Sequence, residues 1–222
     1  MRRARLCHVS CRAKADLIDY IKQELSVYYP KGVLSPDYTS LINARQLDRL
    51  KNYLEQARAA GVECENLMPQ GPEQSDGKLA LHLLHQPGDE LDVMQDEIFG
   101  PLLPIFTYAD MSDALSYIQQ KPRPLSMYLF TQQSDDQQRC EESIASGSLV
   151  INHTLVQVAQ ADLPFGGIGE SGMGAYHAEE GFRTFSHSKS VLRKRGPNLL
   201  ALLRPPYRRS IHRLVAKFWT FL

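Results

Sequence analysis

Apolar side chains recur at helical spacing twice in the first third of the chain. The first such stretch spans residues 13–29, and the second begins after Asn43, a common helix-capping residue, and ends before Gly61. The apolar faces consist of Leu17, Ile18, Ile21 and Leu25 in the first stretch, and of Leu47, Leu50 and Leu54 in the second. Because residues three or four positions apart lie on one side of a helix, the pattern predicts two helices that each bury one face.

Short apolar runs then alternate with amphipathic stretches. The runs, which predict strands, are residues 78–86, 102–109, 125–132 and 147–153, and the stretches, which predict helices, are 111–121 and 134–146. Ser112 and Ser134 are expected to open these helices, since serine side chains accept hydrogen bonds from the free N–H groups of a helix start. Strands and helices that alternate at this spacing predict an α/β fold, with a parallel sheet flanked by helices.

A long glycine-rich segment follows the last apolar run and predicts an irregular loop. Within it, Gly167, Gly169 and Gly172 form the pattern G-x-G-x-x-G, which cradles a pyrophosphate in dinucleotide-binding proteins. That use requires a preceding strand and an acidic residue about twenty positions further on. Pro164 disfavours the strand, and no acidic residue lies at that distance. Positive φ angles, or close approach to another part of the protein, explain these glycines better.

The composition, with 43% apolar and 23% charged residues among 222, is typical of a soluble globular protein. The chain has no run of eighteen apolar residues, and its N-terminal segment lacks the apolar core of a signal peptide, so a cytoplasmic protein is expected. The net charge of zero conceals an asymmetry, because ten Lys or Arg but no acidic residue follow Glu180. The sequence therefore predicts an acidic body with a basic tail.

The basic tail ends in a pattern typical of an amphipathic helix. Its apolar side chains would share one side of that helix, and they are Ile211, Leu214, Val215, Phe218, Trp219 and Leu222. The basic residues Arg208, Arg209, Arg213 and Lys217 fall mostly elsewhere. This pattern favours peripheral contact with a membrane surface and, equally, a helix that docks on another part of a protein. The terminal apolar run disfavours a nucleic-acid partner.

The four cysteines and seven histidines offer no set with metal-ligand spacing. Cys7 and Cys11 lie close together, but no second pair of Cys or His stands at the spacing of a zinc site. His82 and His85 form a single H-x-x-H pair within an apolar run, where structural histidines are the favoured interpretation. No metal site is predicted.

Three segments resemble the aldehyde dehydrogenase superfamily. The segment at 95–108, QDEIFGPLLPIFTY, is similar to the family's E-E-I-F-G-P motif. The segment at 151–192, INHTLVQVAQADLPFGGIGESGMGAYHAEEGFRTFSHSKSVL, resembles the family's closing segment. The segment at 35–54, SPDYTSLINARQLDRLKNYL, resembles the class 3 branch with its bacterial coniferyl aldehyde dehydrogenases. The resemblance covers residues 13–192.

This resemblance implies the C-terminal portion of a catalytic domain, and it divides the chain into four parts. Residues 1–12 match the family poorly, 13–180 would form part of the catalytic domain, 181–195 an oligomerisation arm strand, and 196–222 the basic tail with its helix. In the family the arm strand pairs with a partner subunit. The implied assembly is a homodimer, or a mixed dimer with a relative, through this arm.

The resemblance also implies contacts with cofactor and substrate. Glu97 would hold the ribose hydroxyls of the nicotinamide half of NAD or NADP, since a carboxylate accepts two hydroxyl donors, and Phe99 would lie against the nicotinamide ring. Asn152 and Phe165 would line the channel of the aldehyde substrate, although a structural hydrogen bond to the loop explains Asn152 at least as well. Gln157 stands where many relatives have histidine, and no chemistry is predicted for it.

The family's nucleophilic cysteine lies in a G-Q-x-C sequence, which does not occur in these 222 residues. The sequences around Cys7 and Cys11 do not resemble that loop, and the resemblance includes neither the general-base glutamate nor the dinucleotide-binding fold. No catalytic residue is therefore predicted, and the chain alone is expected not to oxidise aldehydes. The alternative is a non-catalytic interaction protein that pairs with a full-length relative.

Overall fold

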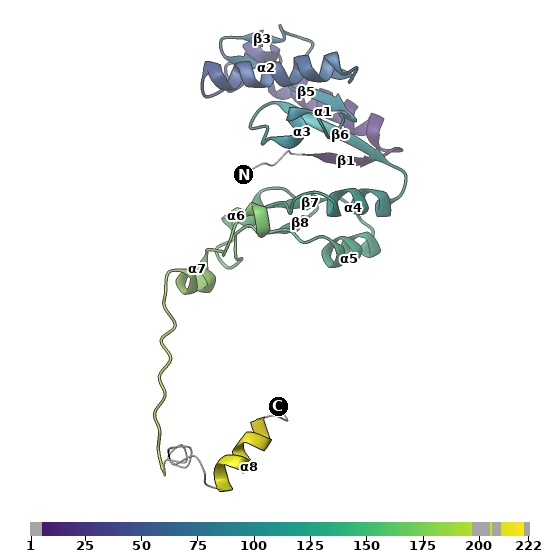
Figure 1. Cartoon of the computed structure of the whole chain (residues 1–222). Coiled ribbons are helices and arrows are strands. Elements are labelled where there is room, and N and C mark those ends of the chain that lie inside the picture. The colour runs from purple at the N-terminus through teal and green to yellow at the C-terminus, as the bar shows by residue number, and fades with distance from the viewer. Residues whose placement is uncertain (1–5, 197–204, 206–209, 220–222) are drawn as a thin grey trace. The chain divides into compact units, whose positions relative to one another are not determined.

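Figure 1 shows the computed structural model of the chain, which describes residues 6–196, 205 and 210–219. The chain divides into two units, Met1–Phe185 and Ser186–Leu222. The first unit contains all the strands found among the described residues. The fold therefore has one α/β unit and one further unit, which contains helix α8 (Ser210–Trp219).

A four-stranded sheet with the order β1–β6–β5–β2 carries most of the first unit's core. β6 (Leu102–Tyr108) pairs in parallel with β1 (Cys7–Ser10) on one side and with β5 (His82–His85) on the other. The edge strand β2 (Cys64–Asn66) runs antiparallel to β5. The predicted α/β fold with parallel strands is confirmed, and one antiparallel edge strand is added to it.

Helices α1 (Lys14–Tyr28) and α2 (Ala44–Ala59) cover opposite faces of this sheet. Leu83 and Leu84 are neighbours on β5, so their side chains point to opposite faces. Leu83 packs in one cluster with apolar side chains of α1, and Leu84 packs in another with those of α2. Both helices lie within the predicted stretches, and the predicted apolar faces are the ones that pack on the sheet.

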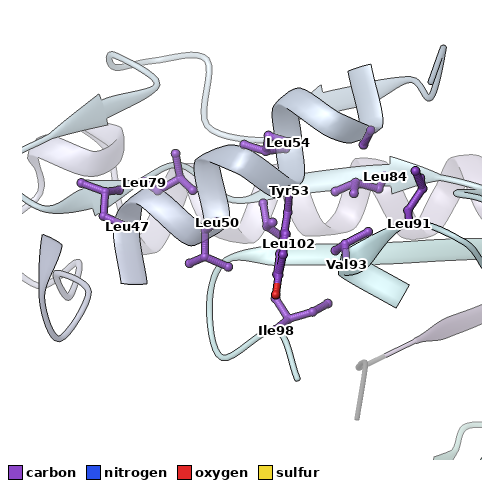
Figure 2. Close-up of a cluster of buried hydrophobic side chains, with 11 residues drawn as sticks. Leu47, Leu50, Tyr53, Leu54, Leu79, Leu84, Leu91, Val93, Ile98 and Leu102 are labelled. Carbon is purple, nitrogen blue, oxygen red and sulfur yellow. The ribbon is translucent and has the colours of Figure 1, made fainter. Parts of the chain in front are cut away.

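The cluster beneath α2 ties the helix to the segment that precedes β6. Its buried members are Leu47, Leu50, Tyr53, Leu54, Ala57, Leu79, Leu84, Leu91, Val93, Ile98 and Leu102 (Figure 2). Val93 comes from the short helix α3 (Asp92–Gln95), and Ile98 comes from the turn that follows it. Asn43 caps α2 as predicted, since its Oδ1 accepts a hydrogen bond from the Gln46 N–H at 3.0 Å.

The run at 78–86, predicted as one strand, is divided between two sheets. β4 (Lys78–Leu79) pairs antiparallel with β3 (Gln74–Ser75), whereas β5 joins the four-stranded sheet. Just after β4, the Ala80 N–H donates to the carbonyl of Glu73, the residue before β3, at 2.8 Å. The backbone at Ala80 is therefore still paired with the β3 segment. The prediction of one strand is wrong because the backbone changes its hydrogen-bonding partner after residue 80.

The remaining α/β pattern forms a separate two-stranded parallel sheet with two helices. Its elements are α4 (Met111–Gln119), β7 (Met127–Leu129), α5 (Ser134–Ser143) and β8 (Leu149–Ile151). Each lies within its predicted stretch, and Cys140 of α5 is fully buried between the helices and this sheet. Asp110, rather than Ser112, caps α4, since its Oδ1 accepts a hydrogen bond from the Ser112 N–H at 2.7 Å.

The segment after β8 is largely irregular, as predicted, but it contains three short helical elements. These are α6 (Val156–Ala159), the 3-10 turn η2 (Gly169–Ser171) and α7 (Ala178–Thr184). The four glycines between residues 166 and 172 lie in and around η2. The loop is thus long, and backbone hydrogen bonds such as those between Phe165 and Tyr176 hold parts of it.

The arm strand expected at 181–195 does not form in the structure of the single chain. Residues 181–184 belong to α7, and residues 185–196 adopt neither strand nor helix. The backbone groups of α7 bond within the helix. The Gly181 N–H donates to the His177 carbonyl at 3.0 Å, and the Phe185 N–H donates to the Gly181 carbonyl at 3.2 Å. A strand needs a partner for its backbone groups, and no strand in the described part of the chain pairs with this one.

The helix expected in the tail is present as α8. Its ten residues include Ile211 and Arg213, whereas Leu222 and Arg208 of the predicted amphipathic pattern lie outside the described residues. Within the described ranges, none of the helices is both long and apolar enough to cross a bilayer. The tail helix is therefore confirmed over the residues that the structure describes.

Candidate functional site

The turn between α3 and β6, residues 96–101, carries the two predicted cofactor contacts. Its central residue, Ile98, is buried in the cluster beneath α2 (Figure 2). On either side of Ile98, Glu97 is half-buried and the Phe99 side chain is 70% exposed. Phe99 has a φ of 43°, a left-handed conformation that costs a non-glycine residue about 1–2 kcal/mol. An exposed ring on a strained backbone is typical of a binding site.

Gly100 allows this turn to lie directly against α2. A Cβ atom at residue 100 would stand 2.2 Å from the Cδ1 atom of Leu50. Leu50 is fully buried, so its side chain has no room to move aside. Glycine is therefore the residue that this position requires.

Arg49 and Tyr53 of α2 bind the turn through hydrogen bonds. Arg49 Nη1 donates to the Glu97 carbonyl at 3.1 Å, and Nη2 donates to the Ile98 carbonyl at 2.6 Å. The Tyr53 hydroxyl accepts from Arg49 Nη1 at 3.0 Å and donates to Asp96 Oδ2 at 2.9 Å. Three consecutive residues of the turn are thus bonded to one helix.

The Glu97 carboxylate is left available by these contacts. Arg49 binds the Glu97 carbonyl, and no hydrogen bond or ion pair among the described residues involves the Glu97 carboxylate. A carboxylate can accept hydrogen bonds from two hydroxyl groups, and an exposed phenyl ring can pack against a planar group. The turn thus offers both kinds of contact that the resemblance implies for Glu97 and Phe99.

Asn152, at the end of β8, binds the backbone that leaves β7. The Thr131 N–H donates to Asn152 Oδ1, and Asn152 Nδ2 donates to the Thr131 carbonyl, both at 2.9 Å. Asn152 has a φ of 56°, which asparagine tolerates better than most residues. Both ends of its amide are therefore engaged in a structural contact, and its place in a substrate channel stays a prediction.

Gln157 of α6 is buried, with 6% of its surface exposed. Its Nε2 lies 3.3 Å from the Ser126 Oγ and 3.3 Å from the Tyr128 hydroxyl, while its Oε1 is buried without a hydrogen-bond partner. These contacts connect α6 to β7. They give Gln157 a structural role.

Phe165 lies half-buried in a small aromatic group. Its backbone and that of Tyr176 exchange two hydrogen bonds, at 2.9 Å and 3.0 Å. The two rings meet edge to face with their centroids 5.6 Å apart, and the His177 ring stacks on Phe165 at 6.4 Å. Such a group can pack against an aromatic or aliphatic ligand. Among the described residues, no hydrogen bond or ring contact joins it to Glu97 or Phe99.

The glycines of the G-x-G-x-x-G pattern form a close-packed turn. A Cβ atom at Gly167 would stand 2.1 Å from the carbonyl oxygen of Ser171, and Gly169 has a φ of 64°. The Ser171 hydroxyl accepts from the Ile168 N–H at 2.6 Å and donates to the Ile168 carbonyl at 2.8 Å. The expectation of positive φ angles and close approach is confirmed.

His82 and His85 contact separate carboxylates from opposite faces of β5. His82 Nε2 lies 2.9 Å from Glu73 Oε1, and His85 Nε2 lies 2.9 Å from Glu65 Oε2. Burial lowers the pKa of His82, although the Ala80 carbonyl and Glu73 act in the opposite direction. Within the described residues, no cluster of three or more His, Cys, Asp or Glu could hold a metal ion.

Comparison with known proteins places this arrangement in a family. A sequence model described as the aldehyde dehydrogenase family matches residues 15–191, which is most of the chain. This chain belongs to the aldehyde dehydrogenase family. The resemblance noted at 95–108 and 151–192 is thereby confirmed, as is the α/β portion of a catalytic domain.

Individual relatives of this aldehyde dehydrogenase chain extend well beyond it. It is 43% identical over 211 residues to the "Probable coniferyl aldehyde dehydrogenase" of Pseudomonas aeruginosa, covering 95% of this chain and 44% of the relative. It is 36% identical over 207 residues to the 4,4'-diaponeurosporen-aldehyde dehydrogenase of Staphylococcus aureus. That match covers 92% of this chain and 44% of the relative. The AldH enzyme of Staphylococcus aureus, solved in a substrate-bound state, superposes with a TM-score of 0.72 at 34% identity, covering 95% of this chain and 45% of AldH. The chain thus spans less than half the length of these relatives.

Proposed function

We propose that this chain is the C-terminal portion of the catalytic domain of an NAD(P)-dependent aldehyde dehydrogenase, which oxidises an aldehyde to the carboxylic acid. The observation that carries the proposal is the turn at 96–101, where an unbonded Glu97 carboxylate stands beside the exposed Phe99 ring. The name of the Pseudomonas aeruginosa relative supports an aromatic aldehyde of the coniferyl type as substrate.

In this proposal the turn holds the nicotinamide half of the cofactor. Glu97 accepts hydrogen bonds from both ribose hydroxyls, and the Phe99 ring limits the positions of the nicotinamide. When bound, the nicotinamide supplies the hydride acceptor for the oxidation. The bonds from α2 keep the turn in one conformation, so little ordering is needed on binding.

The aldehyde would enter beside the loop that follows β8. Phe165 and Tyr176 offer ring edges and faces that suit an aromatic substrate. Asn152 would border this channel while its amide holds the backbone of Thr131. Phe165 and Asn152 are therefore proposed to shape the channel and to take no part in bond making.

The cysteines of this chain are poor candidates for the nucleophile. Burial raises the pKa of the Cys7, Cys64 and Cys140 thiols, which disfavours the reactive thiolate. Cys11 lies in the turn after β1, outside any G-Q-x-C sequence. We therefore propose that this chain takes part in aldehyde oxidation only together with the region of the full-length relatives that it does not cover.

A chimeric enzyme tests this function. The segment of the Pseudomonas aeruginosa relative that matches residues 15–191 is replaced by those residues, and reduction of NAD⁺ or NADP⁺ is followed with coniferyl aldehyde and an aliphatic aldehyde. We expect aldehyde-dependent activity in the chimera and none in the 222-residue chain. A chimera that has the parent's circular dichroism and oligomeric state but no activity would contradict the proposal.

Pairing with an intact relative is a second candidate function. Residues 185–196 form no strand in the single chain, and their apolar side chains Val191 and Leu192 are 66% and 95% exposed. We propose that this arm adds a strand to a partner subunit in a homodimer or a mixed dimer. A tagged chain should retain the co-expressed Pseudomonas aeruginosa relative, and Val191→Pro should abolish retention by removing a backbone donor. If the unsubstituted chain and the Val191→Pro variant retain the relative equally, pairing through this arm is contradicted.

A further inference from the structure

One face of α2 is devoted to the turn at 96–101. Gln46, Arg49, Leu50 and Tyr53 stand at positions i, i+3, i+4 and i+7 of the helix, so they lie on one side of it. Arg49 Nε donates to Gln46 Oε1 at 2.8 Å, which fixes one edge of the guanidinium on the helix. Its Nη atoms then reach the turn. This face therefore grips the turn by packing through Leu50 and by hydrogen bonds through Arg49 and Tyr53.

We propose that Arg49 is a positioning residue, whose guanidinium fixes the backbone of the turn so that Glu97 and Phe99 are presented together to the nicotinamide half of the cofactor. The inference rests on the proposed function for the identity of that ligand. Arg49 binds the carbonyls of Glu97 and Ile98 and leaves the Glu97 carboxylate alone. It thus fixes the turn without occupying the group that would accept the ribose hydroxyls.

The geometry requires the planar fork of arginine. One guanidinium serves Gln46, Tyr53 and two successive carbonyls, whereas the single ammonium of lysine cannot reach all of them. The φ of 43° at Phe99 is unfavourable by itself, so the turn relaxes when these bonds are lost. Without these bonds the side chains of Glu97 and Phe99 would no longer be held in one arrangement, while the rest of the core would stay in place.

Limited proteolysis of the 222-residue chain tests the grip on the turn directly. Chymotryptic cleavage after Phe99 is followed by mass spectrometry and divided by the cleavage rate after Phe185, which is 90% exposed. Arg49→Met should raise this ratio about tenfold, because cleavage follows the population of the locally opened turn. Arg49→Lys should raise it nearly as much, and Arg45→Met, an exposed arginine one turn earlier on α2, should leave it unchanged.

Two results would overturn the proposal. The first is an unchanged ratio in Arg49→Met, which would show that the turn holds its conformation without the guanidinium. The second is a ratio that rises equally in Arg45→Met, which would assign the effect to general weakening of α2. Both readings come from the chain itself and do not depend on aldehyde oxidation.

The chimeric enzyme supplies the functional readout. Arg49→Met should raise the KM for the dinucleotide about tenfold and leave the KM for the aldehyde within about twofold, since only the cofactor turn is released. Equal changes in both constants would overturn the positioning role. An inactive unsubstituted chimera would contradict the proposed function, while the cleavage ratio at Phe99 would still decide whether Arg49 holds the turn.

Discussion

Leu50 occupies the space that a side chain at Gly100 would need, since a Cβ atom there would stand 2.2 Å from Leu50 Cδ1. Leu50 is fully buried on α2, so the contact sets how closely the turn approaches the helix. That approach brings the Glu97 carbonyl within 3.1 Å of Arg49 Nη1. A glycine and a leucine that are far apart in sequence thus determine where the proposed cofactor contacts lie.

We expect Gly100→Ala to lower the free energy of unfolding by about 1–3 kcal/mol, because the added methyl overpacks a filled core. Leu50→Ala should cost about 2–5 kcal/mol by leaving a cavity. The methyl at residue 100 would partly fill that cavity, so the double variant should lose less stability than the sum of the single variants. Urea denaturation measures all four proteins, and strictly additive losses would contradict the contact.

Asn152→Ala should lower the free energy of unfolding by about 1–2 kcal/mol, because it removes two hydrogen bonds to the backbone of Thr131. Asn152→Asp keeps the acceptor and loses the donor, so an intermediate loss is expected. Gln132→Ala, at an exposed neighbour of Thr131, is the matched control for urea denaturation. If Asn152→Ala is as stable as the unchanged chain, the structural role of its amide is wrong.

The stability of the chain should fall as the pH drops from about 7.5 to about 5.5. Burial lowers the pKa of His82 from its ordinary value of 6.5, and burial lowers that of His8 in the same direction. The folded chain therefore binds fewer protons than the unfolded chain below pH 6.5. The stability is complete above that pH and declines below it.

Urea denaturation across this pH range checks the histidine effect. His82→Gln should weaken the pH dependence, since one of the two groups that resist protonation in the folded state is removed. His187→Gln, at an exposed position, should retain it. A chain that becomes more stable as the pH falls would contradict the direction assigned to His82 and His8.

The basic tail leads to a prediction of its own. The second unit, Ser186–Leu222, contains nine Lys or Arg and no acidic residue, and we propose that it binds anionic bilayers with α8 at the surface. The chain should float with vesicles rich in phosphatidylglycerol and not with neutral phosphatidylcholine vesicles. Replacing Arg193, Lys194 and Arg195 by Gln should weaken binding about a hundredfold, at about 1 kcal/mol for each charge. Equal flotation with neutral vesicles would contradict an electrostatic anchor.

Local sequence signals predicted the elements whose partners are close in sequence. Asn43 caps α2, and the apolar stripe of that helix faces the core, because capping and helical spacing depend on neighbouring residues. The N-terminal residues carry no recognisable pattern, yet Val9 of β1 is buried in the sheet through its pairing with β6. Strand pairing between residues about a hundred positions apart leaves little trace in the local sequence.

The candidate site was predictable in part for the same reason. Glu97 and Phe99 follow from a short motif. The residues that hold their turn lie on a helix more than forty positions earlier, where Arg49 binds the Glu97 and Ile98 carbonyls and Tyr53 binds Asp96. Their spacing of four positions on the buried side of α2 was the available signal, although polar residues on an apolar face are easily passed over. The resemblance implied a strand in the arm, but a strand requires a partner, and no strand among the described residues pairs with it.

The most direct measurement compares Glu97→Gln with the unsubstituted chimera in the kinetics of dinucleotide use. The amide accepts fewer hydrogen bonds and has no charge, so kcat/KM for the dinucleotide should fall about tenfold or more while the KM for the aldehyde changes little. Glu90→Gln, at an exposed position before the same turn, serves as the control and should behave like the unsubstituted chimera. A Glu97→Gln chimera with an unchanged kcat/KM for the dinucleotide would contradict the assignment of this turn to the cofactor.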